Sequence, residues 1–447
     1  MLAQWLRWLY QSPPRTLVLG FAVIIFIGAQ LLALPAAAAD GQPTRWIDAL
    51  FTATSATCVT GLVTVDTGTH YSVFGQIVIL LLIQIGGLGF MTMATLFAFF
   101  LKRKISLKER LILQEALNQS SIEGIIRLVR RVILYALTIE TAGALLFTGR
   151  FLFDMPPGRA VYYGVFHAVS FFNNAGFDLM GNFRSLTDYV DDPLVNLVTM
   201  LLIVTGGLGF VVLSDLTDWR RNRRLSLHSK VVLSMTGLLI AVGAIVIFAF
   251  EYGNPATMQP LSLGGKIWSA LLQSVSPRTA GVNTLDMGGL RQATQFFIII
   301  LMFIGASPGS TGGGIKTTTF AALLGAVWAM VRGKEDVVMF KHRLAQERVY
   351  KALTVTLLSL SLVMAATMVL ATTEDHHFLQ ILFEVTSAFG TVGLTIGLTP
   401  HLTLAGKIII ILMMFAGRMG PLTLGYALAP KPGRELYRYA EGKIIIG

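Results

Sequence analysis

Four short runs, each ending in a glycine, recur along this chain and constrain its fold more than any other feature. They occupy residues 51–61, 166–176, 271–281 and 383–393, so the final glycines lie 115, 105 and 112 residues apart. Each run is too short and too polar to cross a bilayer, yet lies between longer apolar stretches. Four such units in one polypeptide predict fourfold pseudo-symmetry around a central path for ions.

The composition places this chain in a membrane. Of its 447 residues, 54% are hydrophobic and 13% are charged, whereas soluble domains carry about 25% charged residues. A water-soluble protein this apolar would expose an adhesive surface, so we predict an integral membrane protein. A crossing needs about 20 apolar residues. Such stretches predict eight crossings, near residues 17–35, 73–101, 132–149, 194–216, 231–250, 292–330, 352–371 and 404–428.

The basic residues predict the orientation of the chain. They gather in segments 102–131, 220–230 and 332–351 and in the tail from Lys431, while the intervening connections are poorer in Lys and Arg. By the positive-inside rule, both termini are cytoplasmic and the four runs face outward in the cell membrane. The net charge of +11 therefore suits anionic lipid rather than nucleic acid. The apolar run at 17–35 is longer than a signal-peptide core of about 7–15 residues, so we expect it to be retained.

The pattern predicts an all-α integral membrane fold of four helix–pore-loop–helix repeats with eight transmembrane helices. Two crossings per repeat return the chain to the same side, so the symmetry axis lies along the membrane normal. The expected segments are a cytoplasmic N-terminus 1–16, repeat 1 at 17–101 (filter 47–66), a basic cytoplasmic loop 102–131, repeat 2 at 132–216 (filter 162–180), a cytoplasmic loop 217–230, repeat 3 at 231–331 (filter 266–284, interrupting loop 305–316), a cytoplasmic loop 332–351, repeat 4 at 352–428 (filter 378–396) and a cytoplasmic tail 429–447.

The residues around each glycine predict a cation filter. A short pore helix, such as the segment from Trp46, points its partially negative C-terminus at the axis. We expect extended backbone from there to the glycine, which at membrane depth is tolerated only in a protein interior or along a water-filled path. Backbone carbonyls can replace the water shell of a potassium ion. Glycine gives them the freedom to turn inward, as Gly61, Gly176, Gly281 and Gly393 would do.

The kind of ion, and an alternative role for the glycines, must also be considered. No ring of Asp or Glu accompanies the glycines, since Asp178 follows only the second one. A carboxylate filter for divalent ions is therefore disfavoured. The alternative remains that the glycines serve close helix packing, as small residues commonly do in membranes.

The four runs resemble those of the membrane subunit in the Ktr branch of the Trk/Ktr/HKT potassium transporter superfamily. The resemblance is carried by Leu50–Thr57 with Val59–Leu62, Phe172–Phe177, Ser276–Gly281 and Ser387–Thr395. It extends through all four repeats and so covers nearly the whole chain. The direct start with the first repeat is typical of the Ktr branch rather than the Trk branch.

The resemblance implies a homodimer with one pore per subunit and a cytosolic ring of nucleotide-binding regulatory subunits. It implies no covalent cofactor, potassium as the transported ion and sodium as a candidate activator. The implied ion-binding filter residues are Cys58, Val59, Thr60, Gly61, Asn173, Asn174, Ala175, Gly176, Arg278, Thr279, Ala280, Gly281, Gly390, Thr391, Val392 and Gly393. A glycine rather than a serine at position 61 resembles the potassium-selective members. The role of Cys58 stays unexplained.

The apolar region 292–330 is interrupted by a glycine-rich segment that cannot continue a helix. If its flanks cross the membrane, the segment lies at mid-depth under the filter, where flexible backbone must line the pore. The resemblance implies an intramembrane gate, formed by Gly305, Ala306, Ser307, Pro308, Gly309, Ser310, Thr311, Gly312, Gly313, Gly314 and Lys316. A phosphate-binding loop is disfavoured because Ile315 precedes Lys316 where that motif needs glycine. A packing kink remains an alternative.

The corresponding helices of the other repeats carry a glycine hinge at Gly86–Phe90, Gly206–Phe210 and Gly417–Pro421, and Arg418 adds a charge there. An arginine at this depth is costly and is a functional candidate by default. The resemblance implies that Arg418 contacts the gate. The alternatives are that it repels the ion or extends to the membrane interface.

No catalytic arrangement is visible. The sequence has one cysteine, and His70, His167, His376 and His377 lack ligand spacing with carboxylates. Asp215 and Asp218 are expected to pair with neighbouring Arg220 and Arg221. We therefore predict passive, gated potassium uptake and no enzyme activity. The alternatives are a sodium- or proton-coupled symporter on the same scaffold and, less favoured, an ATPase subunit.

Overall fold

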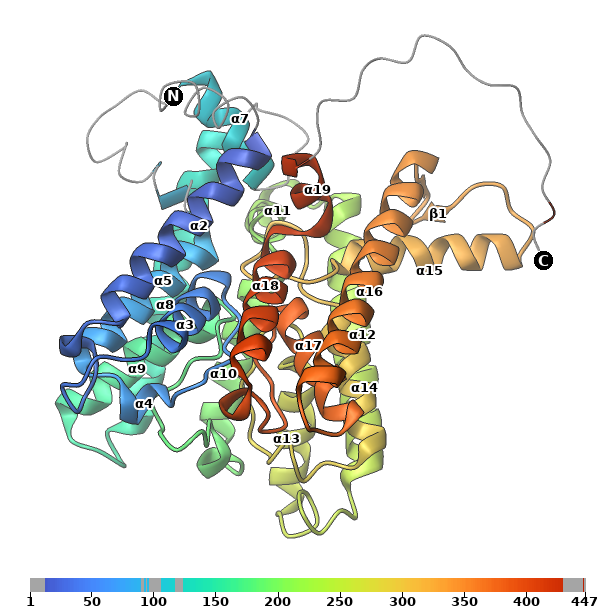
Figure 1. Ribbon diagram of the computed structural model, residues 1–447. Coiled ribbons are helices and arrows are strands. Elements are labelled where there is room, and N and C mark those ends of the chain that lie inside the picture. Colours follow the sequence, from blue (N-terminus) through green and yellow to red (C-terminus); the bar gives the residue numbers. More distant parts are fainter. Residues whose placement is uncertain are drawn as a thin grey trace.

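A computed structural model describes residues 13–89, 92, 93, 95, 106–116, 124–428 and 445 of the chain. The described part is built almost entirely of helices, which confirms the predicted all-α class. Figure 1 shows the helices of successive repeats side by side around a common centre. The expected cytoplasmic tail, most of the N-terminal segment and part of the basic loop 102–131 lie outside the described residues.

Each repeat contains an outer helix, a shorter pore helix and an inner helix, in that order. Repeat 1 has α2 (Pro13–Leu32), α3 (Trp46–Cys58) and α5 (Val73–Leu88), and repeat 2 has α8 (Ile125–Phe151), α9 (Pro157–Phe172) and α10 (Pro193–Leu208). Repeat 3 has α12 (Leu227–Glu251), α13 (Leu263–Val275) and α14 (Gln292–Phe303), and repeat 4 has α16 (Gln346–Thr373), α17 (Phe378–Gly390) and α18 (Leu404–Met419).

The remaining elements connect or extend these helices. They are η1 (Pro35–Ala37), α4 (Thr67–His70), α7 (Leu107–Ala116), η2 (Thr187–Tyr189), α11 (Phe210–Asn222), α15 (Thr317–Val331), η3 (Thr399–His401) and α19 (Pro421–Leu428). A small antiparallel hairpin joins β1 (Val338–Met339) to β2 (His342–Arg343), with Val338 opposite Arg343.

The described helices account for part of the predicted eight crossings. Four of them, α2, α8, α12 and α16, are long and apolar enough to cross a membrane. Two more spans result if α10 with α11 and α18 with α19 each count as one, although these pairs bend by 99° and 92°. Helix α5 ends at the edge of the described part, and α14 ends at the glycine-rich break. A multi-pass membrane protein follows, and the number eight stays a prediction.

The expected start of the second repeat differs from the structure. Helix α8 begins at Ile125, inside the expected loop 102–131, because its first turns are buried against other helices. Ile125 and Val129 pack with Leu17 of α2 and with Ile112 and Leu113 of α7. Amphipathic packing thus extends the helix past the apolar stretch that defined the predicted crossing.

The region 292–330 is broken between α14 and α15, which confirms the predicted interruption of the helix by the glycine-rich segment. Helix α14 has 12 residues, or about 18 Å at 1.5 Å per residue, which is too short to span the bilayer. In Figure 1, α15 leaves the helix bundle at a steep angle to α16, and the β1–β2 hairpin lies between the two helices. The glycine-rich segment therefore changes the chain direction, which hydropathy alone did not predict.

A repeated contact joins the outer and inner helices of three repeats. A Cβ added at Gly28, Gly143 or Gly243 would meet a leucine of the inner helix, respectively Leu82, Leu202 and Leu301. Each leucine lies four residues before the corresponding hinge glycine, namely Gly86, Gly206 and Gly305. Small residues allow such close approach in a lipid environment. The contact also provides a structural alignment of the repeats.

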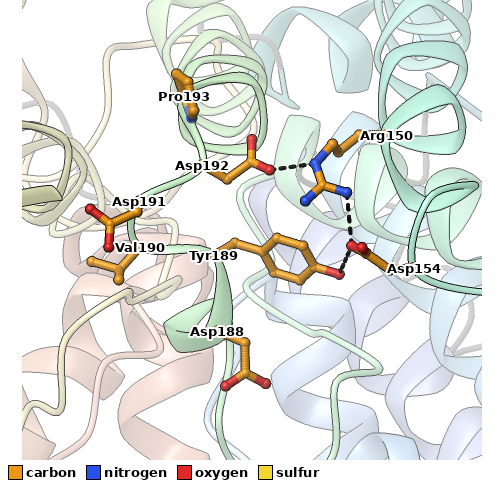
Figure 2. Close-up of a pocket in the computed structure, with 8 residues that line it drawn as sticks. All are labelled: Arg150, Asp154, Asp188, Tyr189, Val190, Asp191, Asp192 and Pro193. Carbon is orange, nitrogen blue, oxygen red and sulfur yellow. Dashed lines mark hydrogen bonds and ion pairs between the residues drawn. The ribbon is translucent and has the colours of Figure 1, made fainter. Parts of the chain in front are cut away.

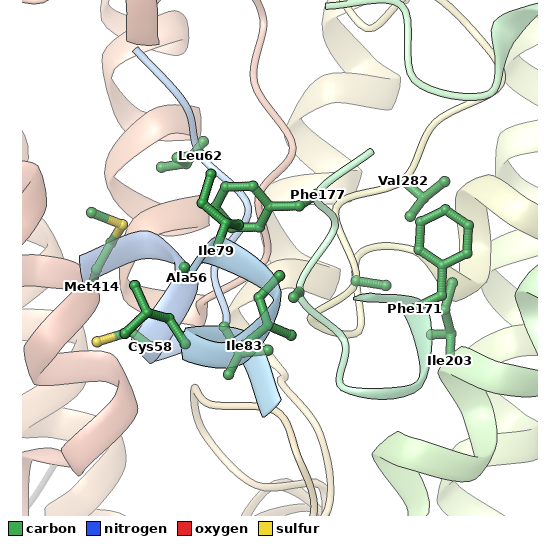
Figure 3. Close-up of a cluster of buried hydrophobic side chains, with 14 of the residues drawn as sticks. Ala56, Cys58, Leu62, Ile79, Ile83, Phe171, Phe177, Ile203, Val282 and Met414 are labelled. Atoms are coloured by element: carbon green, nitrogen blue, oxygen red, sulfur yellow. The ribbon is translucent and has the colours of Figure 1, made fainter. Parts of the chain in front are cut away.

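The pore helices form the buried centre of the bundle. Most residues of α3 after Ile47 are buried, and Figure 3 shows Ala56 and Cys58 close to Ile83 of α5 and Met414 of α18. Phe171 and Ile203 surround the corresponding part of the second repeat. The packing fixes where each pore helix ends, and therefore where each filter segment starts.

Polar contacts connect neighbouring repeats on the side of the pore-helix N-termini. Lys407 of α18 forms a largely buried ion pair with Asp48 of α3, with 2.6 Å between Nζ and Oδ1. The N–H of Phe183 donates to Asp66 at 2.7 Å. The hydroxyl of Ser262 donates to Asp191 at 2.5 Å. These contacts tie repeat 4 to repeat 1, repeat 1 to repeat 2, and repeat 2 to repeat 3.

Candidate ion-conduction site

The four predicted filter glycines form a closed ring. A Cβ added to any one of them would overlap the carbonyl oxygen just before the glycine of the next repeat: Gly61 faces Ala175, Gly176 faces Ala280, Gly281 faces Val392 and Gly393 faces Thr60. For Gly61 and Gly176 the distance from the added Cβ to that oxygen would be 2.5 Å, which leaves no room for a side chain. The order closes after four repeats, so the glycines surround one centre.

The backbone before each glycine alternates in hand. The residue two positions earlier is left-handed, with φ of 59° at Val59, 58° at Asn174, 73° at Thr279 and 51° at Thr391. The glycines have φ of 92°, 68°, 71° and 95°, and the residue between each pair has negative φ. Alternation of hand turns successive carbonyls toward the same side. These residues lie outside the pore helices and form neither a continued helix nor a ladder of strand pairs.

The backbone N–H groups of the segments bond away from the ring. The N–H before the glycine donates to the carbonyl of a serine in the pore helix: Thr60 to Ser55, Ala175 to Ser170, Ala280 to Ser276 and Val392 to Ser387, at 2.7–2.9 Å. In addition, the Ser55 hydroxyl accepts from Gly61 N–H at 3.0 Å and the Ser387 hydroxyl from Gly393 N–H at 3.1 Å. Since buried N–H groups must be paired, these bonds leave the carbonyls of the segments available.

These serines were not among the predicted site residues. Their sequence signal is a serine six positions before the glycine in three repeats, at Ser55, Ser170 and Ser387. The third repeat has Val275 at that position and uses Ser276 instead.

The first residue of each predicted filter quartet belongs to the end of the pore helix. Cys58 and Gly390 are the last residues of α3 and α17, and Asn173 caps α9. Arg278 lies in the turn after α13, with its Nη2 donating to the Thr236 hydroxyl at 3.1 Å. The ring itself is formed by the last three residues of each quartet.

The glycine-rich loop 305–316 lies directly against the ends of three filter segments. Gly313 N–H donates to the Thr391 hydroxyl at 2.9 Å, and the Thr311 hydroxyl donates to Asn174 Oδ1 at 3.3 Å. A Cβ at Gly312 would overlap the Thr279 hydroxyl. The sequence prediction that places this loop under the filter therefore agrees with its position.

Hydrogen bonds to the second repeat give the loop a defined shape. Ser307 N–H donates to Gly207 O at 3.0 Å, and Phe210 N–H donates to Gly309 O at 2.9 Å. An isolated bridge pairs Ile304 with Ile315, so the two ends of the loop lie together. These bonds connect the loop to the point where α10 bends into α11.

Two cationic side chains hold the loop. Arg418 donates through Nη1 to Thr311 O and through Nη2 to Gly86 O, so that it bridges the loop and the hinge of repeat 1. Lys316 Nζ donates to Gly312 O at 2.7 Å. Arg418 therefore has backbone partners inside the protein instead of extending to the membrane interface. Two positive charges below the filter would repel a permeating cation, and sequence reasoning gave Lys316 no such separate role.

The hinge glycines place the inner helices against the pore helices. A Cβ at Gly86, Gly206 or Gly417 would overlap the carbonyl four residues before the filter glycine, respectively that of Thr57, Phe172 and Phe389. The last glycine of each hinge, Gly89, Gly209 and Gly420, has φ of 83°, 93° and 80°. Because that conformation favours glycine, the hinge sequence explains the bends after Gly209 and Gly420.

Carboxylates surround the outer end of the second repeat. Asp178 accepts from Met180 N–H at 2.9 Å and lies in the connection between α9 and α10. Burial raises the pKa of the Asp178 carboxyl to about 7; the Met180 hydrogen bond opposes this shift and the charge of Asp66 adds to it. This group would therefore change its charge near neutral pH.

A cleft near this end is lined by residues that hydrogen-bond to one another and join neighbouring helices. Figure 2 shows Arg150 between Asp154 and Asp192, with Tyr189 below them. The Tyr189 hydroxyl donates to Asp154 at 3.0 Å, and Asp192 also accepts from two N–H groups at the start of α10. These contacts anchor α8 to α10.

The cytoplasmic acidic residues have partners that the sequence did not predict. Asp218 pairs with Arg131 of α8 at 2.7 Å, and Asp215 accepts from the hydroxyls of Ser226 and Ser229. The side chains of Arg220 and Arg221 lie outside the described part. The tertiary contact between α8 and α11 supplies a partner that neighbours in sequence could not reveal.

A family model described as TrkH, cation transport protein, matches residues 16–432. The chain belongs to this family. Membership confirms the predicted resemblance. The family is one of cation transporters and not of enzymes.

Several relatives are similar over their full length. The chain is 48% identical to the Ktr system potassium uptake protein B of Bacillus subtilis, covering 99% of this chain and 98% of that protein. It is 41% identical to the potassium/sodium uptake protein NtpJ of Enterococcus hirae, covering 98% and 97%. The crystal structure of the potassium transporter TrkH from Vibrio parahaemolyticus has the same fold, with a TM-score of 0.71, 19% identity, and 92% and 84% coverage.

Proposed function

We propose that this chain is the ion-conducting subunit of a gated potassium uptake system in the cell membrane, with both termini cytoplasmic. The observation that carries the proposal is the closed ring in which the glycine of each repeat lies against the carbonyl before the next one. Carbonyl oxygens from four segments can replace the hydration shell of potassium. The names of the relatives, potassium uptake protein and potassium/sodium uptake protein, support this cation class.

Permeation is passive in this proposal, and the loop 305–316 is the gate. The loop lies against Asn174, Thr279 and Thr391 and is held by Arg418. An ion leaving the filter meets this loop and two cationic side chains. Opening requires the loop to move away, which would break the bond of Arg418 to Thr311 O.

The chain works as a homodimer with a cytosolic ring of nucleotide-binding regulatory subunits in this proposal. The term "Ktr system" in the name of the Bacillus relative supports additional components. The basic segments on the side of the gate, including Arg348 and Lys351 at the start of α16, are candidates for contact with the ring. Sodium is proposed as an activator rather than a coupled ion.

Rubidium uptake by the purified protein in liposomes tests the proposal. With potassium inside and rubidium outside, uptake should follow the potassium gradient and persist when sodium and a proton gradient are both absent. Uptake that requires a sodium or proton gradient at a fixed stoichiometry would instead establish a coupled symporter. No rubidium uptake by correctly folded protein, with the loop 309–314 intact or deleted, would refute ion conduction.

A further inference from the structure

A buried carboxylate lies behind the second filter segment and is not explained by the proposed filter or gate. Glu140 is on the outer helix α8 and has 6% of its surface exposed. An ionisable side chain inside a transmembrane helix is a functional candidate by default. Its contacts connect it to the filter.

Three polar side chains form a closed triangle at this point. Asn173 Nδ2 donates to Glu140 Oε1 at 3.0 Å and to Gln84 Oε1 at 2.9 Å. Gln84 Nε2 donates to Glu140 Oε2 at 3.1 Å. Asn173 Nδ2 also lies 2.9 Å from Val169 O, so its two hydrogens are shared among three acceptor oxygens, and the amide nitrogen rather than its oxygen must face them.

The triangle requires one carboxylate. Asn173 uses one nitrogen for two corners, so both groups that it faces must present oxygen. The remaining corner joins Glu140 to Gln84, where one atom must donate and the other accept. Three carboxamides cannot meet these conditions together, whereas one carboxylate with two carboxamides can. Glu140 accepts at both oxygens, as an ionised carboxylate does.

The other repeats lack this arrangement. Glu140 lies three residues before Gly143, and the aligned positions before Gly28 and Gly243 are Ile25 and Ile240. Gln84 lies two residues before the hinge glycine Gly86, where the other inner helices have Val204, Phe303 and Phe415. At the aligned positions of the described helices, the polar triangle therefore lies between repeats 1 and 2 and has no counterpart.

The triangle acts on the filter through Asn173. This residue caps the pore helix α9 and immediately precedes Asn174, whose left-handed backbone starts the filter segment. Asn174 Nδ2 in turn donates to Arg278 O at 3.3 Å and to the Thr279 hydroxyl at 3.2 Å in the third repeat. Displacement of Asn173 would thus affect two neighbouring filter segments.

We infer that Glu140 is a positioning residue for the second filter segment and that its carboxylate, through Asn173 and Gln84, sets the discrimination of potassium from sodium. This inference rests on the proposed potassium conduction. The carboxylate holds Asn173 in place and adds negative charge behind the ring, and both effects favour a fixed, cation-attracting filter.

Glu140→Gln tests the inference because it keeps the shape and breaks the triangle. In liposomes, the potassium-to-sodium selectivity, measured by competition against rubidium uptake, should fall about tenfold, as expected for the loss of a hydrogen bond to a charged group. The half-saturating rubidium concentration should rise. Glu251→Gln is the matched control: Glu251 is a buried carboxylate of the outer helix α12 that accepts from Thr257, Thr294 and Asn254, none of which belongs to a filter segment. Its selectivity should stay at the wild-type value.

A swapped pair makes the test specific. In Gln84→Glu with Glu140→Gln, the carboxylate moves to position 84, and all three hydrogen bonds of the triangle can form again with donors and acceptors exchanged. Selectivity should return to within about twofold of wild type, as a coupling between two contacting residues predicts. Packing cannot explain such a recovery. Glutamate and glutamine have nearly the same volume, so the single variant leaves the packing unchanged.

The outcomes distinguish failure of the proposed function from failure of the role assigned to Glu140. Wild-type protein that does not discriminate potassium from sodium would refute the proposed function itself. Wild-type selectivity in folded Glu140→Gln, or a folded swapped pair that stays as poor as the single variant, would overturn only the role of Glu140. If Glu140→Gln does not fold, the swapped pair decides: wild-type selectivity supports the inference and reduced selectivity overturns it.

Discussion

Gly61→Ser is the perturbation that addresses the filter most directly. Gly61 has φ of 92°, a conformation in which a residue with a side chain is strained by about 1–3 kcal/mol. The added Cβ would lie 2.5 Å from Ala175 O and 3.3 Å from Gly176 Cα. Because real Cβ contacts are not shorter than 3.0 Å, the second segment must move by roughly half an ångström.

The magnitude follows from this strain. A free-energy difference of about 1.4 kcal/mol corresponds to tenfold in an equilibrium constant. If the strain is relieved by displacing the ring, the selectivity for potassium over sodium should fall roughly tenfold to hundredfold. The loss should appear as stronger inhibition of rubidium uptake by sodium in liposomes.

Gly41→Ser is the matched control for this experiment. Gly41 also has positive φ, at 71°, but an added Cβ there would meet no atom within 4 Å. It therefore reproduces the backbone strain of the substitution without touching the ring, and its selectivity should match wild type. Unchanged selectivity in folded Gly61→Ser protein would refute the assignment of Gly61 to the filter.

Three further predictions concern the gate, the outer carboxylate and the contact between repeats. Deletion of Gly309–Gly314 should raise basal rubidium flux in the absence of any partner protein, and a folded but inactive pore would contradict gating by this loop. The pKa of Asp178 is raised to about 7, so its negative charge is present above that pH and is lost as pH falls; rubidium uptake should decline from pH 8 to pH 6 in wild type and much less in Asp178→Asn, which should resemble wild type at low pH. Asp48→Asn leaves the cation of Lys407 buried without its partner, which should destabilise the protein by about 3–5 kcal/mol and lower its thermal midpoint in detergent; an unchanged midpoint would show that the pair is dispensable.

The sequence predicted the parts of the fold that depend on local composition. Apolar stretches located the outer helices, the glycine runs located the four segments that close the ring, and the five glycines between 305 and 314 located the break. The contact of Arg418 with the loop followed from the resemblance and from the cost of an arginine at membrane depth. These features are encoded by residue types that have few alternative uses inside a membrane.

Other features depend on tertiary contacts and could not be predicted. The left-handed backbone at Val59 and Thr391 opposes the preference of β-branched residues, so these residue types gave no signal for it. The early start of α8 depends on packing against α2 and α7. The triangle of Gln84, Asn173 and Glu140 joins residues that lie 33 to 89 positions apart, so no local pattern indicates it.

A structure of the protein determined with bound rubidium tests the central claim most directly. The account predicts anomalous scattering from an ion at the centre of the ring, within coordination distance of the carbonyl oxygens of Thr60, Ala175, Ala280 and Val392. An ion bound elsewhere, or these four carbonyls turned away from the centre in the ion-bound protein, would contradict it.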